Sequence, residues 1–171
     1  MHVLVTYASR HHATAQMAQA IAEVLREPAE ALSTPTVDVR AVDDVDALDH
    51  YDAVVLGSSV YMGRWLKLAR RFARENAAEF AARPLWMFSS GPIGEPLAPT
   101  AEAIDVMTLA ESLGARGSRI FAGRLRTAEL GLGERATARL VHAANGDYRA
   151  WDEIRAWAAD IARALAAPAG H

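Results

Sequence analysis

The sequence contains no cysteine. This absence excludes disulfide bonds, thiol catalysis, iron–sulfur clusters and cysteine-ligated zinc sites. Any redox chemistry would therefore have to be carried by a bound organic cofactor. No apolar run is long enough to cross a bilayer, and the residues after Met1 predict a strand rather than a signal peptide. From these absences we expect a cytoplasmic protein without a transmembrane segment.

The chain also lacks a strong excess of either charge. Its formal net charge is −3 at pH 7, and Lys67 is its single lysine among many arginines. A balance this even does not favour binding to nucleic acid or to an anionic membrane through the overall field. Of the 171 residues, 51% are hydrophobic and 23% are charged, which is typical of a globular protein. With no repeat or linker, we predict a single domain over residues 1–171.

Apolar runs and helical periodicities alternate along the chain. We predict strands at residues 2–7, 37–41, 53–57, 85–88 and 118–123, and helices at 14–26, 63–80, 105–114 and 151–165. The strand at 37–41 alternates apolar and polar residues, which indicates an edge, whereas the other four are interpreted as buried. Asp105 and Gly114 are the expected ends of the third helix. This alternation predicts a doubly wound α/β sheet of five parallel strands, in the order 2-1-3-4-5, with helices on both faces.

Ligands of such sheets bind at the carboxyl ends of the strands. The first loop at that edge opens a helix, whose N-terminus offers free N–H groups and a positive dipole end. Ser9 and Thr14 add hydroxyl donors there, and Arg10, His11 and His12 add cationic character. The loop therefore predicts a phosphate cradle. The alternative is that the hydroxyls only cap the helix and the histidines lie in water.

The second loop at this edge combines glycines with large side chains. Gly57 and Gly63 would let the backbone turn and approach a ligand closely. Tyr61 could stack on a flat ring, and Met62 could pack against it. Trp65 shares the periodicity of the following helix, so core packing is the favoured interpretation for it. The third loop, residues 89–96, is rich in glycine and proline, as expected for a segment that approaches a planar ligand.

These segments, in this order, resemble the flavodoxin-domain family. The resemblance rests on Ser9-Arg10-His11-His12-Ala13-Thr14 after the first strand, then Gly57-Ser58-Ser59-Val60-Tyr61-Met62-Gly63, then Ser89-Ser90-Gly91-Pro92. It covers nearly the whole chain. The chain is especially similar to the subfamily that includes menaquinone-dependent protoporphyrinogen dehydrogenase, in which the segment between the last strand and the last helix is enlarged, as residues 124–148 are here. The stretch 146–151 is also similar to that subfamily.

The resemblance implies a flavodoxin-like fold that binds FMN. The phosphate would lie on residues 9–14, and the isoalloxazine ring between residues 58–64 and 89–94. The implied cofactor-binding residues are Ser9, Arg10, His11, His12, Ala13, Thr14, Ser58, Ser59, Val60, Tyr61, Met62, Gly63, Ser89, Ser90, Gly91 and Pro92.

One residue departs from the family pattern, which is Ser or Thr, two residues, Gly, one residue, Thr. The glycine position is occupied here by His12. Histidine is one of the few residues other than glycine that adopt positive φ with some frequency, so it could keep the shape of the loop. Its protonated ring could also pair with phosphate. Alternatively, the ring fills the phosphate pocket and weakens or abolishes FMN binding.

Three functions stay open at this point. The first is an FMN-dependent oxidoreductase that acts on a small hydrophobic substrate or a quinone. The second is a small FMN electron carrier that docks to a redox partner protein. Carriers of this kind are usually strongly acidic, which a net charge of −3 does not match. The third is a descendant of the family that has lost FMN. No catalytic residue is assigned, although Tyr61, Arg64 and Glu95 are within plausible reach, and we expect no metal because His11 and His12 lack a third ligand nearby.

The arginine-rich segment 124–149 has two interpretations. It is either a surface segment, with a short helix at 134–143 whose arginines lie in solvent, or a peripheral membrane or partner contact. An apolar patch around Tyr61, Met62 and Trp65 would equally suit a homodimer. A receiver domain, a glycine-fingerprint dinucleotide fold and a serine hydrolase are disfavoured, because their motifs are missing.

Overall fold

The computed structural model describes residues 1–27, 34–61, 64–91, 101–125 and 146–167. Its main sheet has five parallel strands in the order β2-β1-β3-β5-β6. The strands are β1 (His2–Ala8), β2 (Thr36–Ala41), β3 (Ala53–Tyr61), β5 (Leu85–Ser90) and β6 (Gly117–Phe121). Counted among the parallel strands, this is the order 2-1-3-4-5, so the predicted flavodoxin-like topology is confirmed.

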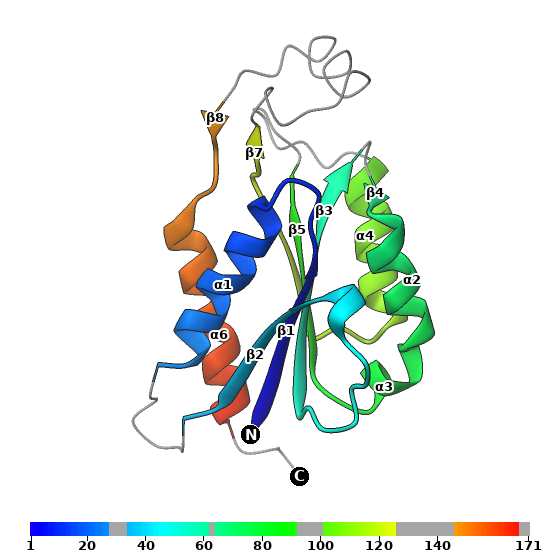
Figure 1. Ribbon diagram of the computed structural model, residues 1–171, viewed down its shortest axis with the longest axis vertical. Helices are drawn as coiled ribbons and strands as arrows, with labels where there is room; N and C mark the ends of the chain where they lie inside the picture. The colour runs from blue at the N-terminus through cyan, green and yellow to red at the C-terminus, as the bar shows by residue number, and fades with distance from the viewer. Residues whose placement is uncertain (28–33, 62–63, 92–100, 126–145, 168–171) are drawn as a thin grey trace.

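Helices cover both faces of the sheet (Figure 1). One face carries α1 (Ala13–Leu25) and α6 (Trp151–Ala166), and the other carries α2 (Lys67–Glu75), α3 (Ala77–Ala81) and α4 (Ala101–Ser112). A short 3-10 helix, η1 (Val42–Asp44), follows β2. Each face has its own buried apolar cluster, one containing Ile21 and Ile154 and the other Leu56 and Phe80. Burial of these side chains on both faces provides the hydrophobic stabilisation of the fold.

Burial along the strands follows their place in the sheet. All six residues of β5 are buried, because this strand has neighbours on both sides and helices over both faces. β2 is an edge strand, as predicted, and Val37 is its one buried residue. β6 is also an edge strand, and it starts at Gly117 with Arg119 exposed. The prediction of a buried strand at 118–123 is wrong because only one side of β6 has a partner strand.

The single helix predicted over residues 63–80 is also wrong. Arg64–Trp65 form a short strand, β4, that pairs antiparallel with the end of β3. Two helices then follow, separated at Asn76. Both the backbone N–H and the side-chain amide of Asn76 donate to the Phe72 carbonyl, at 3.1 and 2.9 Å, at the end of α2. The apolar residues do have helical spacing, but the helix itself is interrupted at Asn76.

Helix α4 begins earlier than expected. It starts at Ala101, so Asp105 lies inside the helix and is not its N-cap. The predicted stop is confirmed, because Gly114 adopts φ +65 just beyond the last turn. The Ala115 N–H then donates to the Ala110 carbonyl at 2.9 Å, the bonding pattern of a helix that ends at a left-handed glycine.

A second, two-stranded sheet lies between β6 and α6. It pairs β7 (Arg124–Leu125) with β8 (Gly146–Asp147) in antiparallel fashion. The helix predicted at 134–143 lies outside the described residues. Within the described ranges, no helix combines the length and apolarity needed to span a membrane.

Candidate functional site

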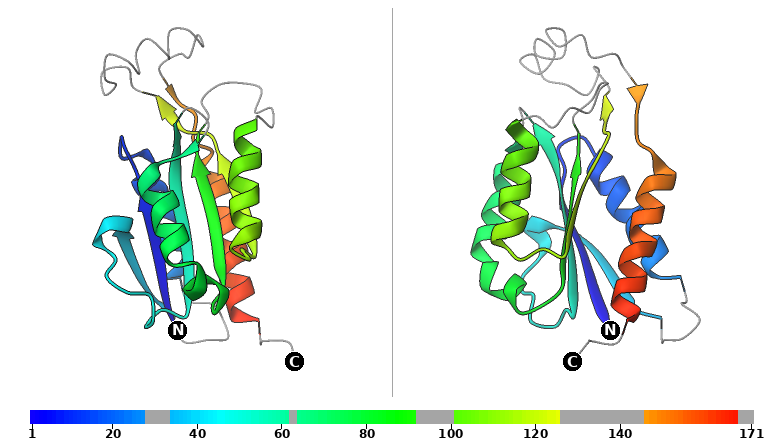
Figure 2. Two further views of the ribbon diagram at one scale, coloured as in Figure 1. Left: turned by 90° about the vertical axis from the view of Figure 1, so that its right-hand side faces the viewer. Right: turned by 180° about the vertical axis from the view of Figure 1, so that it is seen from behind.

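The carboxyl ends of the three central strands meet at one edge of the sheet, where the three predicted loops begin (Figures 1 and 2). Ala8 of β1 pairs with Ser58 of β3, and Ser58 pairs with Ser89 of β5. One residue further on, Ser59 pairs with Ser90. The parallel register therefore brings these strand ends side by side, although they are far apart in the sequence.

Helix α1 begins directly after the first loop. Its N-cap is His12, with φ 59° and ψ −6°, and among the described residues no side chain caps the helix. The first turn contains no acidic residue. The Gln16 N–H donates to the His12 carbonyl at 3.0 Å, which starts the helical hydrogen bonds. The N–H groups of the first turn are thus oriented for an anion and meet no negative side chain.

Two hydroxyls of this loop are buried without a partner. Neither Ser9 Oγ nor Thr14 Oγ1 has a hydrogen-bond partner in the described part of the chain, and Thr14 is fully buried. Leaving a buried hydroxyl unpaired costs about 1–3 kcal/mol, so such groups usually have a partner. A phosphate at the helix N-terminus would supply acceptor oxygens to both hydroxyls. The residues present therefore fit the phosphate group of a nucleotide.

The His12 side chain leaves the loop free. The residue is exposed, and its left-handed backbone is the conformation that the family pattern reserves for glycine. The positive φ agrees with the sequence-based alternative in which histidine keeps the shape of the loop, and the exposure of the residue does not favour a ring that fills the phosphate pocket. Its neighbours differ in burial, since Arg10 is exposed and His11 is half-buried.

The buried serines at the ends of β3 and β5 have partners within the protein. Ser58 Oγ donates to the Ser59 carbonyl at 2.9 Å and accepts from the Leu66 N–H at 3.2 Å. The Trp65 indole N–H donates to Ser89 Oγ at 2.8 Å. Trp65 is only 2% exposed, which confirms its predicted place in the core. These bonds fasten the β3–β4 hairpin to β5, so the two side chains position the edge.

The expected role of Gly57 is wrong. It lies inside β3, and a Cβ there would come within 2.1 Å of the Phe88 ring. The glycine therefore makes room for a core side chain and not for a ligand. Gly91 is different, because its φ of 110° turns the chain away just after β5, while its N–H donates to the Phe121 carbonyl at 2.9 Å. A residue other than glycine would be strained there.

The second and third predicted loops either differ from the expectation or extend beyond the described residues. The segment 58–61 proves to be strand rather than loop, with Tyr61 paired to Arg64 along the backbone. The predicted apolar patch around Tyr61, Met62 and Trp65 loses Trp65, which is buried. Met62, Gly63, Pro92 and Glu95 lie outside the described residues.

Sequence analysis missed two residues near this edge. Thr6 is fully buried in β1, two positions before Ala8, and its hydroxyl has no partner within the described ranges. Its polarity in an otherwise apolar run was the available signal. Arg149 is the second: its guanidinium, with a side chain 5% exposed, donates to both carboxylate oxygens of Asp147 at 2.5 and 2.7 Å and to the Gln16 side-chain oxygen at 2.6 Å. No sequence signal pairs residues this far apart.

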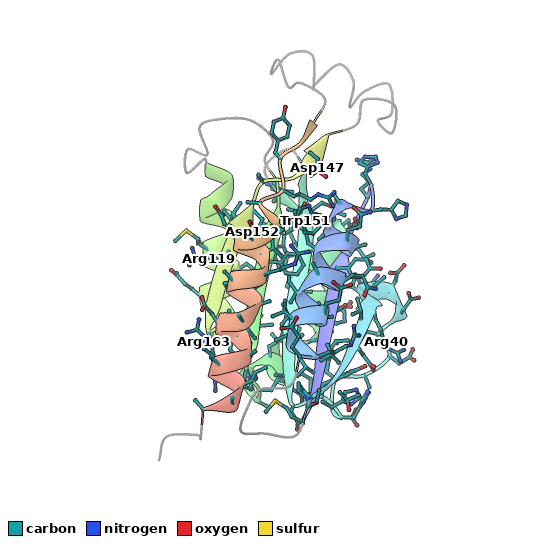
Figure 3. All side chains as sticks on the ribbon, turned by 90° about the vertical axis from the view of Figure 1, so that its left-hand side faces the viewer. Arg40, Arg119, Asp147, Trp151, Asp152 and Arg163 are labelled. Carbon is teal, nitrogen blue, oxygen red and sulfur yellow. The ribbon has the colours of Figure 1, made fainter. Side chains whose placement is uncertain are left out.

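Arg149 connects the β7–β8 ribbon to the first turn of α1. Its guanidinium carbon lies 4.4 Å from the centre of the Trp151 ring, a cation–π contact. Asp147 and Trp151 flank it at the upper end of α6, next to α1 (Figure 3). Because the guanidinium is neutralised by Asp147, its main effect is to hold these segments together beside the loop.

Asp38 is a carboxyl group with a lowered pKa, and it lies away from this site. The hydrogen bond from the Tyr51 hydroxyl, at 2.8 Å, lowers the pKa of Asp38, and His2 and Arg40 lower it further. Burial and the same hydrogen bond raise the pKa of Tyr51. Asp38 pairs with Leu4, so this network lies towards the amino end of β1. Among the described residues, no three potential ligands gather into a metal site.

A doubly wound parallel sheet, whose first strand leads into an uncapped helix with two unpartnered hydroxyls, places the protein in the doubly wound α/β class, with a candidate anion site at the carboxyl edge of the sheet. The family profile described as "Flavodoxin domain" matches residues 4–151, from β1 to the start of α6. The chain therefore belongs to the flavodoxin domain family. No curated protein sequence matches it significantly.

Solved structures share the fold at low sequence identity. A flavodoxin from the domain Archaea is 21% identical, with a TM-score of 0.63 over 98% of this chain and 100% of its own. An oxidoreductase from Corynebacterium diphtheriae is 13% identical, with a TM-score of 0.64 over 99% of both chains. The flavodiiron protein from Giardia intestinalis is 15% identical, with a TM-score of 0.60 over 96% of this chain and 36% of its own.

Proposed function

We propose that this protein binds FMN and acts as an FMN-dependent oxidoreductase. The observation that carries the proposal is the pair of buried, unpartnered hydroxyls of Ser9 and Thr14 at the uncapped N-terminus of α1. Membership of the flavodoxin domain family supports a flavin rather than another phosphate-bearing ligand.

In this proposal the phosphate lies in the first loop. The hydroxyls of Ser9 and Thr14 donate to its oxygens, and the N–H groups of the first turn of α1 add further donors and the positive end of the helix dipole. His12 contributes its backbone conformation while its side chain remains in solvent. The alternative of lost FMN binding depended on His12, and this geometry favours retention.

The isoalloxazine ring would lie between the end of the β3–β4 hairpin and the segment after β5. The hydrogen bonds of Ser58 and Ser89 keep these two walls in register. The flavin, when bound, supplies the hydride and electron chemistry. The protein supplies a fixed site, and we assign no acid or base among its own residues.

The substrate is proposed as a small hydrophobic molecule or a quinone. A porphyrinogen is the finer candidate, and it is supported only by the similarity of segments 124–148 and 146–151 to the protoporphyrinogen dehydrogenase-like subfamily. An FMN electron carrier is the second candidate. The net charge of −3 supports the enzyme over the carrier, because carriers usually dock through strongly acidic surfaces.

The binding test compares two flavins on the full chain. FMN and riboflavin share the isoalloxazine ring but differ in the phosphate, so the structure predicts that FMN binds at least about 100-fold more tightly, since charge-assisted hydrogen bonds are each worth about 1.5–3 kcal/mol. Quenching of flavin fluorescence measures both affinities, and inorganic phosphate should compete with FMN. Equal affinities, or no binding of either, would refute the phosphate assignment.

The activity test follows with the FMN-loaded protein. Stopped-flow absorbance at the flavin bands would record reduction by porphyrinogens and reoxidation by quinones. Turnover with a quinone and a hydrophobic reductant supports the oxidoreductase. Flavin cycling that requires a protein donor or acceptor, with none of these small molecules active, would support the carrier instead.

A further inference from the structure

The stretch 146–151 reads Gly-Asp-Tyr-Arg-Ala-Trp, and the proposed flavin site gives it no role. It begins with the pairing of β7 and β8 and leads directly into α6. The Tyr148 N–H donates to the Gly123 carbonyl at 3.1 Å, just beyond the end of β6. Gly146 makes room for the Tyr148 ring, because a Cβ there would lie 2.8 Å from a ring carbon. The stretch is therefore fastened to the end of β6 before α6 begins.

The Arg149 guanidinium in this stretch is held on three sides. The Asp147 carboxylate accepts from its Nε at 2.7 Å and from its Nη2 at 2.5 Å. The centre of the Trp151 ring lies 4.4 Å from the guanidinium carbon. The third group, Nη1, donates to the Gln16 side-chain oxygen at 2.6 Å. The side chain is 5% exposed, and a planar fork that is both paired and stacked has little freedom to turn.

Arg149 connects parts of the carboxyl edge that are not neighbours in the sheet. In the strand order, β3 and β5 lie between β1 and β6. The Gly91 N–H, just after β5, donates to the carbonyl of Phe121 at the end of β6. Hydrogen bonds and short stretches of backbone thus lead from the segment after β5, through the end of β6 and Tyr148, to Arg149 and then to Gln16 in α1. Helices α1 and α6 lie side by side where this path ends (Figure 2, right).

Gln16 lies one helical turn beyond the start of α1. Its N–H donates to the carbonyl of His12, the N-cap, and its side chain lies on the exposed side of the helix. On the other side, Thr14 and Met17 are buried against the protein. Core packing therefore holds the inner side of this turn, and Arg149 holds the outer side.

We propose that Arg149 is a positioning residue that fixes the distance between the phosphate subsite and the ring subsite. This role rests on the proposed function, in which the phosphate lies at the start of α1 and the isoalloxazine ring lies beside the segment after β5. A ligand that fills two subsites at once binds more tightly than either of its parts, provided that the subsites are held at the span of the ligand. Loss of Arg149 should therefore weaken the binding of FMN, which spans both subsites. Riboflavin and inorganic phosphate each fill one subsite, so their binding should hardly change.

Gln16→Ala and Arg149→Lys each break the connection in the full chain. Alanine removes the acceptor, and lysine keeps the positive charge but lacks the fork that pairs with Asp147 and Gln16 at the same time. Each variant should bind FMN about tenfold more weakly, whereas its affinities for riboflavin and phosphate should stay within about twofold of the wild type. The double variant should be no weaker than either single variant, because both substitutions remove the same contact.

Gln19→Ala and Arg163→Lys are the matched controls. Gln19 is an exposed glutamine of the same helix, and Arg163 is an exposed arginine of α6 that also pairs with an aspartate, Asp160. Both controls should bind FMN like the wild type. Quenching of flavin fluorescence measures the two flavin affinities, isothermal titration calorimetry measures the affinity for inorganic phosphate, and circular dichroism verifies that each variant is folded.

Unchanged FMN affinity in Gln16→Ala and Arg149→Lys overturns the positioning role. An equal loss of riboflavin or phosphate affinity also overturns it, since Arg149 would then support one subsite or the whole fold rather than the distance between the subsites. Failure of the proposed function is recognised separately, in the wild type. A wild-type protein that does not prefer FMN to riboflavin refutes the phosphate assignment, and the positioning role with it, before any variant is compared.

Discussion

Two pairs of buried hydroxyls at the same edge of the sheet behave in opposite ways. Ser58 and Ser89, at the ends of β3 and β5, bond to the backbone and to the Trp65 indole. The hydroxyls of Ser9, in the loop after β1, and of Thr14, in the first turn of α1, have no partner in the described part of the chain. The first pair is satisfied within the protein, whereas the second pair is the one that we propose to bind the phosphate. All four side chains are hydroxyls at the same edge of the sheet, so their hydrogen-bond partners are what distinguish the two pairs.

The largest effect is expected from removing the unpartnered pair. The double variant S9A/T14V should bind FMN at least about 100-fold more weakly, because it removes two donors to a charged phosphate, each worth about 1.5–3 kcal/mol. Riboflavin affinity should change by less than about threefold, and the apoprotein should not lose stability, since no bond within the protein is broken.

Fluorescence titration and thermal unfolding of the apoprotein measure these two effects. Ser112→Ala is the matched control, because Ser112 Oγ bonds only to the Leu109 carbonyl, in α4. A double variant that loses stability while keeping its FMN affinity would mean that Ser9 and Thr14 stabilise the fold and do not bind the phosphate.

Gly57→Ala should reduce stability by about 1–3 kcal/mol, the usual cost of overpacking a core. The new Cβ would lie 2.1 Å from the Phe88 ring, a contact that forces the ring or the strand to move. Urea unfolding measures the loss, and the added substitution Phe88→Leu should restore part of it. If Gly57→Ala is as stable as the wild type, the close approach of Phe88 to β3 is wrong.

Ser89→Ala should cost about 1 kcal/mol of stability, because the Trp65 indole N–H would then be buried without an acceptor. FMN affinity should stay within about threefold, since the hydroxyl is already engaged within the protein. Paired measurement of the urea midpoint and of FMN affinity separates the two roles. A variant with unchanged stability and strongly reduced affinity would move Ser89 to the ligand-binding class.

His12→Gly is expected to have the smallest effect. Glycine adopts φ near +59° without the steric cost that an L side chain has there, so stability should rise by up to about 1 kcal/mol. FMN affinity should remain within about threefold of the wild type, because the exposed ring does not occupy the cradle. A large gain in FMN affinity would mean that the histidine ring obstructs the phosphate.

The sequence predicted the sheet well because hydrophobic runs and alternation report burial directly. The topology, the edge position of β2, the stop at Gly114 and the buried Trp65 are all confirmed. The predicted helix at 63–80 failed because helical spacing continues through β4 and α2, while the Asn76 side chain ends α2 through a hydrogen bond that spacing does not encode. The prediction that β6 is buried failed because an apolar pair in the sequence does not reveal whether a strand has one neighbouring strand or two.

The site was predicted in outline and missed in its details. The carboxyl ends of neighbouring parallel strands must meet at one edge of the sheet, so the topology alone predicts where the candidate site lies. Which hydroxyls are engaged depends on contacts between residues far apart in sequence, such as Trp65 with Ser89 and Arg149 with Gln16. These contacts follow from the folded geometry, and no local pattern carries them.

The β7–β8 ribbon makes the chain modular at one point. Arg124 pairs with Asp147 and Leu125 with Gly146, so the described residues on either side of the stretch 126–145 are neighbours in space. The Arg149 guanidinium links this ribbon to α1, because it pairs with Asp147 and donates a hydrogen bond to Gln16. A two-residue Asn-Gly turn could therefore replace the whole intervening stretch, and a different sequence could be grafted in its place. The ribbon would thus allow new recognition segments to be placed beside the carboxyl edge of the sheet, while the sheet itself stays intact.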